Sequence, residues 1–343
     1  MKRHFLDIKP KEIKEYLESL GHGSYRLGQM LEWVYKRNTT DFKDFANLPA
    51  DLRKKLGSDF VLRSFKLTKK SVSGFDGTIR YDFETSDGHI VSAVYLPQNG
   101  RNVICISTQI GCVIGCKFCN SGKRRFVRNL TRGEILEQIL AVQKDVTQKL
   151  DGVLFMGMGE PLLNLENVVS AIKSITDLKQ IGIGRRHVVV STVGFIEQIR
   201  VLRDKKLGVR LAISLHAPDD EIRSRFIPGI VPYTVEEILK EAISYSRANK
   251  TALTIEYILI SGQNDTLLSA RKVVKLIRDN TVNFDKIQIN LIPYNPTEKT
   301  KLSCPDRIKI DSFRSFLVKS KLLAIVREPR GLDIGSACGQ LGV

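Results

Sequence analysis

Hydrophobic residues in the second part of the chain form short runs that alternate with stretches of helical periodicity. The apolar runs have the length of buried strands and span 103–108, 152–158, 187–192, 209–216, 253–260, 286–293 and 322–328. Amphipathic stretches lie between them at 131–143, 166–175, 195–202, 235–246, 269–279 and 313–320. Regular alternation of strand and helix predicts an α/β fold with a parallel sheet. Periodicity alone leaves an open sheet, a full barrel and a partial barrel as alternatives.

The first 100 residues follow two other patterns. Residues 1–59 predict a small helical domain, because they contain three amphipathic stretches, near 9–20, 28–35 and 48–56. Residues 60–100 form short alternating runs separated by Asp-Gly turns, which predict antiparallel strands that lead into the main domain at 101–343. The helical unit is interpreted either as an RNA-binding accessory domain or as a cap on the main domain, and the pattern favours neither.

The chain of 343 residues is strongly basic, with 54 Lys and Arg against 37 Asp and Glu and a formal charge of +17. Such an excess favours a polyanionic partner, because each cation that meets a phosphate releases counterions. A basic surface that serves only solubility is the alternative. The charged N-terminus is unlike a signal peptide, and no apolar run suits a membrane span. Six cysteines, three of them clustered, fit a reducing compartment, so we expect a cytoplasmic protein without a membrane partner.

Cys112, Cys116 and Cys119 form a CxxxCxxC pattern. Three thiols this close can bind one soft metal centre, and no fourth cysteine follows nearby to complete a tetrahedral cage. A four-iron cluster held by three thiolates has one iron open for a further ligand, whereas structural zinc takes four protein ligands. The alternatives are zinc completed by a distant histidine or cysteine such as Cys304, and three cysteines that only pack in a core.

Polar and glycine-rich residues follow several predicted strands, at the end where parallel barrels collect their chemistry. They are Gly159 and Glu160 in GMGEP, Ser191 in STVG, the segment Ser214, Leu215 and His216, and Asn295 in PYNP. Glycine lets the backbone approach a ligand closely, and Glu160 supplies a carboxylate. A simple turn and a core histidine are the alternatives for GMGEP and His216. Near the C-terminus, glycines around Cys338 suggest a mobile tail that places a thiol at the barrel mouth.

Together the motifs resemble the RlmN-type radical S-adenosylmethionine (SAM) methyltransferases over about residues 20 to 340; they are ICISTQIGCxxxCxFC, MGMGEPLLN, STVG, AISLHAP, TIEYILI, INLIPYNP and DIGSACGQL. The resemblance implies a partial (β/α)6 barrel, a [4Fe-4S] cluster on Cys112, Cys116 and Cys119, and SAM contacts at Gly159, Glu160, Ser191, Ser214, Leu215, His216 and Asn295. It also implies methylation of adenosine C2 in 23S rRNA, at the peptidyl-transferase centre, and in certain tRNAs. The sister Cfr type, which methylates C8, carries Ala where this chain has Pro161, so GEP favours C2.

The resemblance further implies a mechanism in two stages that uses two SAM molecules per turnover. Cys338 takes a methyl group from one SAM, and a radical from the second removes hydrogen from that S-methyl group. The resulting carbon radical adds to C2, because an aromatic C–H is neither acidic nor nucleophilic enough for direct displacement. Cys105 then attacks the sulfur of Cys338 and forms a disulfide that a reductant reopens. An electron donor such as flavodoxin or ferredoxin is implied, and we expect a monomer.

One position departs from the family pattern. Family members usually read VETVYLP before the cluster strand, with Glu as the proposed proton acceptor, whereas this chain has Ser92 there. Serine is a poor base at neutral pH, so we assign no proton acceptor.

Two other classes of protein remain as alternatives. A non-catalytic RNA-binding protein with a structural metal leaves Cys105 and Cys338 without a role, and a radical-SAM enzyme acting on a protein or small molecule leaves the basic charge unexplained.

Overall fold

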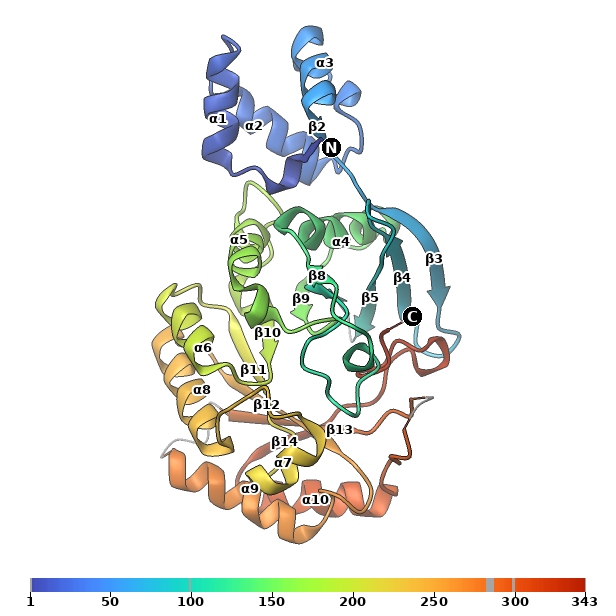
Figure 1. The fold of residues 1–343 in the computed structure, drawn as a ribbon, viewed down its shortest axis with the longest axis vertical. Coiled ribbons are helices and arrows are strands. Elements are labelled where there is room, and N and C mark those ends of the chain that lie inside the picture. The colour runs from blue at the N-terminus through green and yellow to red at the C-terminus, as the bar shows by residue number, and fades with distance from the viewer. Residues whose placement is uncertain (1, 99, 282–286, 298–299, 343) are drawn as a thin grey trace.

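The N-terminal unit is helical, as its periodicity predicts (Figure 1, top). The computed structural model describes residues 2–98, 100–281, 287–297 and 300–342. The helices of the unit are α1 (Pro10–Ser19), α2 (Arg26–Leu31) and α3 (Ala50–Asp59), with a π-helical turn at Glu32–Lys36 after α2. Strand β2 (Phe60–Val61) lies just past residue 59 and pairs in parallel with β1 (Arg3–His4). The two ends of the helical unit therefore lie side by side.

A buried carboxylate joins this unit to the main domain. Glu137 of α4 (Arg132–Asp145) accepts hydrogen bonds from His4 Nε2 at 2.8 Å, from the Ser64 backbone N–H at 2.8 Å and from the Phe65 backbone N–H at 2.9 Å. Because His4 lies at the start of the helical unit and Ser64 and Phe65 lie just after its end, one side chain fixes the orientation of the unit on the barrel.

The expected antiparallel strands are present as β3 (Lys66–Val72), β4 (Ile79–Glu84) and β5 (Ile90–Gln98). β5 turns back on β6 (Arg101–Cys105), and β6 then pairs in parallel with β9 (Gly152–Phe155). The extension is therefore continuous with the main sheet. Ten strands run in the order β14-β13-β12-β11-β10-β9-β6-β5-β4-β3 (Figure 1).

The α/β prediction is confirmed for the main domain. After β9, the parallel strands are β10 (Val188–Thr192), β11 (Arg210–Ser214), β12 (Leu253–Leu259), β13 (Ile287–Pro293) and β14 (Leu323–Val326). The connecting helices after α4 are α5 (Leu165–Thr176), α6 (Ile196–Asp204), α8 (Val235–Asn249), α9 (Leu267–Asn280) and α10 (Arg307–Lys319). Residue 286, where one strand was expected to begin, lies outside the described residues. These units form the partial (β/α)6 barrel that the resemblance implies, with β14 added at its edge.

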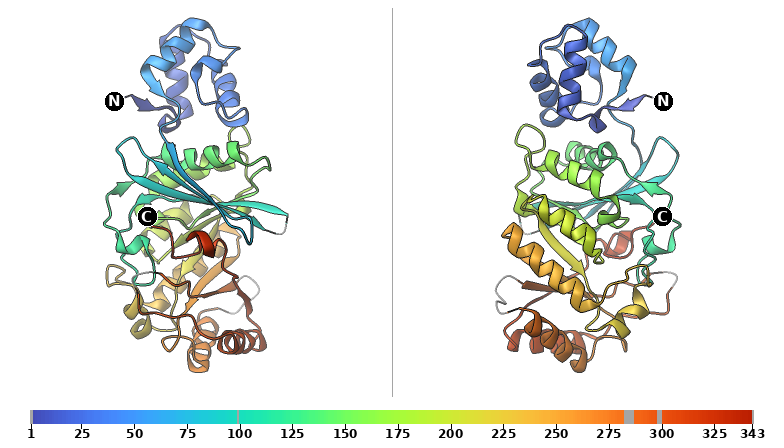
Figure 2. Two further views of the ribbon diagram at one scale, coloured as in Figure 1. Left: turned by 90° about the vertical axis from the view of Figure 1, so that its right-hand side faces the viewer. Right: turned by 60° about the vertical axis from the view of Figure 1, so that its left-hand side comes forward.

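Helix α7 (Asp220–Phe226) is an element that periodicity did not predict. It has only seven residues, too few to show an amphipathic repeat, and it begins where Asp219 Oδ1 accepts the Ile222 backbone N–H at 2.9 Å. Among the described residues, no helix has the length and apolar character needed to cross a bilayer. In the right-hand view of Figure 2, helices line one side of the sheet and the red C-terminal segment lies on the other.

Candidate active site

The three clustered cysteines line one cavity at the carboxyl ends of the strands. They lie in the loop that follows β7 (Gln109–Ile110), and with Glu160 they surround a volume of about 170 Å³ that we call the cluster cavity. Gly111 allows the loop to turn, because its φ is +74° and a Cβ there would lie 2.3 Å from the Arg125 carbonyl oxygen. The CxxxCxxC spacing thus brings its thiols together as expected.

The thiols and the carboxylate of the cluster cavity suit a positively charged ligand. Burial raises the pKa of Cys112 to about 11 and that of Cys116 well above its usual value, and each thiol lies near the others and near Glu160. A bound iron cluster would favour the thiolates by supplying positive charge. No three His, Cys, Asp or Glu side chains of the described residues converge closely enough for a single metal ion, and Cys304 lines neither this cavity nor its neighbour. The three cysteines of the cluster cavity are the residues that could hold an iron–sulfur cluster.

Glu160 is held by backbone groups beside the cysteines. Its Oε1 accepts the Leu162 N–H at 3.0 Å and its Oε2 accepts the Val193 N–H at 2.9 Å. Gly159 has a φ of +98°, and a Cβ there would lie 2.5 Å from the Gln109 Cβ, so only glycine fits. Burial raises the pKa of Glu160 to about 7. A ligand ammonium would favour its ionised form, so the residue suits the amino group of SAM.

The next two strand ends contribute hydroxyls and an imidazole. Ser191 and Ser214 lie on neighbouring strands with their Oγ atoms 3.3 Å apart, and both line the cluster cavity. His216 has a φ of +60°, which is uncommon for a side chain of this size, and its Nδ1 accepts the Ile258 N–H at 3.1 Å. Burial and the nearby Arg223 lower the pKa of His216 to about 3. The ring is therefore neutral, with its proton on Nε2, where it can donate to a ligand.

Leu215 contributes to this site only through the backbone. Its side chain is buried outside the cluster cavity, its N–H bonds to the carbonyl oxygens of Ile213 and Glu256, and its own carbonyl accepts from Arg223. These backbone hydrogen bonds of Leu215 position its neighbours Ser214 and His216. The sequence alone did not indicate this positioning role.

The C-terminal tail lies docked, where the sequence suggested a mobile segment. Asn295, expected among the SAM contacts, donates from Nδ2 to the Cys338 carbonyl oxygen at 3.0 Å, and it lines the cavity next to the cluster cavity. The Asn120 N–H donates to the Gly339 carbonyl at 2.8 Å and Ser121 Oγ to the Leu341 carbonyl at 2.5 Å. Cys338 is therefore held in position by residues that follow the cluster cysteines.

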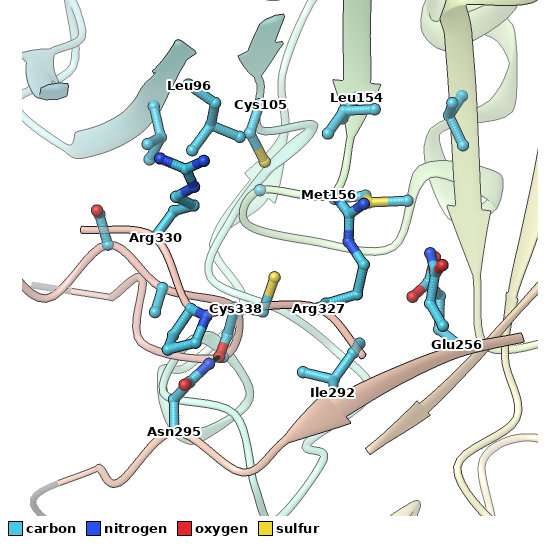
Figure 3. A pocket seen from close by; sticks show the side chains of 18 of the residues that line it. Leu96, Cys105, Leu154, Met156, Glu256, Ile292, Asn295, Arg327, Arg330 and Cys338 are labelled. Atoms are coloured by element: carbon cyan, nitrogen blue, oxygen red, sulfur yellow. Dashed lines mark hydrogen bonds between the residues drawn. The ribbon is translucent and has the colours of Figure 1, made fainter. Parts of the chain in front are cut away.

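Cys105 and Cys338 face each other across a second cavity of about 450 Å³, which we call the thiol cavity. Figure 3 shows their sulfur atoms pointing toward each other from β6 and from the tail. Both cysteines are free. Burial, and next the other thiol, raise the pKa of Cys105 to about 12. Cys338 is exposed to solvent within the cavity, yet the desolvating cavity walls, and next Glu256, raise the pKa of its thiol to about 11. Cys338 also lines the cluster cavity, so one thiol can reach ligands in both.

Two charged residues of the site were missed from the sequence. Glu256 lines both cavities and accepts a hydrogen bond from Asn290 Nδ2 at 2.8 Å. Arg223 is buried and bonds through its guanidinium to the carbonyl oxygens of Val193 and Leu215, which ties the ends of β10 and β11 together. The sequence offered one indication for Glu256, a charged residue inside the apolar run LTIEYILI. It offered none for Arg223, because this residue lies in helix α7, which was not predicted.

Ser92, where the family pattern has Glu, is fully buried and hydrogen-bonded. Its Oγ donates to Asp82 Oδ1 at 2.5 Å, across the β4–β5 pair, and Arg80 Nε donates to the same oxygen at 2.9 Å. The position thus contributes to a Ser-Asp-Arg cluster. Arg80 extends this cluster to the tail through the Gly335 carbonyl oxygen at 3.1 Å.

Substituting Glu256 with glutamine should stabilise the ligand-free protein at pH 8. Burial raises the pKa of Glu256 from 4.5 to about 7, so its contribution to stability is complete below pH 4.5 and is lost as the pH rises through 7. The neutral amide avoids that loss and should add roughly 3 kcal/mol at pH 8 and little at pH 5. Urea unfolding at both pH values measures the difference. Glu241→Gln, which removes a carboxylate paired with Arg200 and Arg203, should destabilise instead; equal effects of Glu256→Gln at both pH values would contradict the prediction.

The fold and the two adjoining cavities define a radical SAM enzyme. Residues 106–277 match the Radical SAM superfamily, and residues 4–62 match the ribosomal RNA large subunit methyltransferase N-terminal domain. A crystal structure of a radical SAM methyltransferase from Sphaerobacter thermophilus superimposes with a TM-score of 0.93 at 32% identity, covering 98% of both chains.

Curated relatives narrow the class to a family. The chain is 43% identical to the probable dual-specificity RNA methyltransferase RlmN of Endomicrobium trichonymphae, over 99% of this chain and 97% of that protein. It is 40% identical to the protein of the same name from Thermotoga neapolitana, with the same coverage. The chain belongs to the RlmN family of radical SAM methyltransferases.

Proposed function

We propose that this protein methylates C2 of an adenosine in 23S rRNA and of an adenosine in certain tRNAs. The observation that carries the proposal is the pair of thiols, Cys105 and Cys338, facing each other across a cavity that adjoins the cluster cavity. The names of the relatives support a dual-specificity RNA methyltransferase. Pro161 favours C2 over the C8 reaction of the Cfr type.

The residues of the site have separate roles in this proposal. Cys112, Cys116 and Cys119 would hold a [4Fe-4S] cluster, and Glu160 would bind the amino group of SAM. When bound, the cluster and two SAM molecules per turnover would supply the methyl group and the one-electron cleavage that creates a carbon radical. Cys338 would carry the methyl carbon between the two cavities, because it lines both.

Product release would depend on the second thiol. Addition of the methylene radical would leave an unpaired electron and the C2 hydrogen on the adenine ring. The ring would regain its aromaticity by losing one electron, which the cluster could take up when bound, and the C2 proton, for which we assign no acceptor. The sulfur of Cys105 would then attack the sulfur of Cys338, which still carries the methylene carbon. The S–S bond forms, the S–C bond breaks with its electron pair going to carbon, and a proton completes the methyl group. A cellular reductant would then reopen the disulfide. We also propose a flavodoxin or ferredoxin as electron donor, a monomeric enzyme that acts in the cytoplasm, and domains at 1–59, 60–100 and 101–343.

Nucleoside analysis of RNA from a deletion strain tests the proposal. Digested 23S rRNA and tRNA should lack 2-methyladenosine that is present in the parent strain and restored by the gene on a plasmid. Loss of 8-methyladenosine would instead support the Cfr-type alternative. Protein purified without oxygen should contain about four irons per chain, and a colourless zinc protein would support the non-catalytic RNA-binding alternative.

A further inference from the structure

The docked tail lies between two exposed edges that each carry an aromatic and a basic side chain. One is the hairpin edge, with Lys69 on β3 and Phe75 in the β3–β4 turn. The other is the loop edge, with Arg125 and Phe126 in the loop before β8 (Arg128–Asn129). Figure 1 shows the red tail between that turn and that loop, and the left view of Figure 2 agrees.

Phe75 projects from a rigid turn. Its side chain is 90% exposed, yet its N–H donates to Ser73 Oγ at 3.2 Å. The turn is also tied to the tail in both directions, since the Gly331 N–H donates to Asp76 Oδ2 at 2.9 Å and the Gly74 N–H donates to Asp333 Oδ2 at 3.1 Å. These hydrogen bonds fix the turn, while the aromatic ring that it carries is exposed to solvent. Such an exposed, fixed ring suits a surface on which a planar partner stacks.

Lys69 lies on the cavity side of the sheet. Ser71, Arg80, Val94 and Cys105 stand opposite one another across β3, β4, β5 and β6, so their side chains share one face, and Val94 and Cys105 line the thiol cavity. Lys69 is two residues from Ser71 and shares that face at the exposed edge of the sheet. Among the described residues it forms no ion pair, so its charge is available to a phosphate.

The loop edge is fixed just as firmly on the other side. The Val127 N–H donates to the Ile110 carbonyl at 2.9 Å, and Lys123 Nζ donates to Thr297 Oγ1 at 3.0 Å. Phe126 is 36% exposed and Arg125 is exposed, with no ion pair among the residues that the structure describes. The same loop bonds to the tail through Asn120 and Ser121, so both edges keep a constant relation to Cys338.

Both the main domain and the helical unit carry an excess of positive charge, roughly in proportion to their lengths. Residues 101–343 contain 37 Lys and Arg against 24 Asp and Glu, whereas residues 1–59 contain 12 against 9. The domain that carries the two thiols therefore has enough excess positive charge of its own to attract a polyanion.

We propose that the RNA strand carrying the target adenosine crosses the tail between these edges, with bases beside the target stacked on Phe75 and Phe126 and phosphates on Lys69 and Arg125. Flanking nucleotides held at both sides would leave the target base over the thiol cavity, where it can turn inward. The inference rests on the proposed function, since it takes RNA as the substrate. Stacking on rings with salt-dependent cation contacts is the mode of single-stranded RNA binding.

Binding of a labelled 23S rRNA fragment containing the peptidyl-transferase loop tests the inference, with the full chain loaded with its cluster. Phe75→Ala should weaken binding by about fivefold to a hundredfold, and Phe75→Leu should not restore it, because leucine has no π-face. Arg125→Gln and Lys69→Gln should each lower the slope of log K against log salt by about 0.7. Leu178→Ala, at a side chain 80% exposed after α5, and Lys205→Gln, after α6, are the matched controls and should bind as the parent does.

Two readouts separate this inference from the proposed function. Methyl incorporation into Cys338 in the absence of RNA should be unchanged in every edge variant, because none of the four residues lines either cavity. Parent-like RNA affinity and salt slope in the Phe75 and Arg125 variants would overturn the inference while leaving the proposed function intact. A parent protein that methylates Cys338 but neither binds nor methylates the RNA would overturn both.

Discussion

Replacing Cys338 with alanine should abolish RNA methylation, by roughly a thousandfold or more. Among the described residues, Cys338 and Cys119 are the cysteines that line both the cluster cavity and the thiol cavity. Because Cys119 is proposed as a cluster ligand, Cys338 is the thiol left to accept a methyl group in one cavity and present it to the other. Alanine removes the sulfur but keeps the tail contacts, because Asn295 bonds to the backbone carbonyl at this position. Loss of activity would therefore report chemistry and not undocking of the tail.

The measurement combines RNA methylation with mass spectrometry of the tail. The parent protein should yield a Cys338 peptide heavier by one methyl group, and the variant should yield none while retaining the same iron content. Cys304→Ala is the matched control, because this exposed cysteine lines neither cavity, and it should keep full activity. Methylated RNA from Cys338→Ala at more than a few per cent of the parent rate would contradict a carrier role.

The fold could be predicted where the signal is local. Buried strands and amphipathic helices of the barrel each occupy a single stretch of sequence, so their periodicity predicted most of them within a few residues. Helix α10 is the exception, since it begins at Arg307, six residues before the stretch predicted at 313–320. Helix α7 gave no such signal, since it is short and depends on the cap at Asp219. The continuity of the antiparallel extension with the barrel rests on the pairing of β5 with β6 and of β6 with β9, and distant pairing leaves no mark in a local pattern.

The candidate site also combines features that a local motif predicts with features that depend on contacts between distant parts of the chain. The cysteine triplet is a local motif and its three thiols do share a cavity. Glu256 was missed because one charged residue in a strand does not reveal which face it takes or what lies opposite. The contact of Asn295 with SAM stays a prediction. Its hydrogen bond to the tail was missed, because it joins residues 43 positions apart and leaves no local signal in the sequence.

Replacing Cys105 with alanine should trap the enzyme covalently on its RNA. Cys105 lies on β6 directly opposite Val94, and in Figure 3 its sulfur points at that of Cys338. Without it, the bond from the Cys338 sulfur to the methylene carbon has no attacking thiol, so the adduct should accumulate to about one per chain and turnover should stop. After nuclease digestion, the Cys338 peptide should carry an adenosine linked through one carbon.

The adduct should depend on both thiols in a defined order. Cys105→Ala with Cys338→Ala should form none, since the carrier is missing, and Cys304→Ala should accumulate none, since release is intact. Burial raises the pKa of Cys105 to about 12, so its thiolate fraction should rise about tenfold per pH unit through the neutral range. The transient adduct of the parent enzyme should therefore be shorter-lived at pH 9 than at pH 7, whereas that of Cys105→Ala should persist equally at both. Free methylated RNA released by Cys105→Ala at the parent rate would show that another group resolves the adduct.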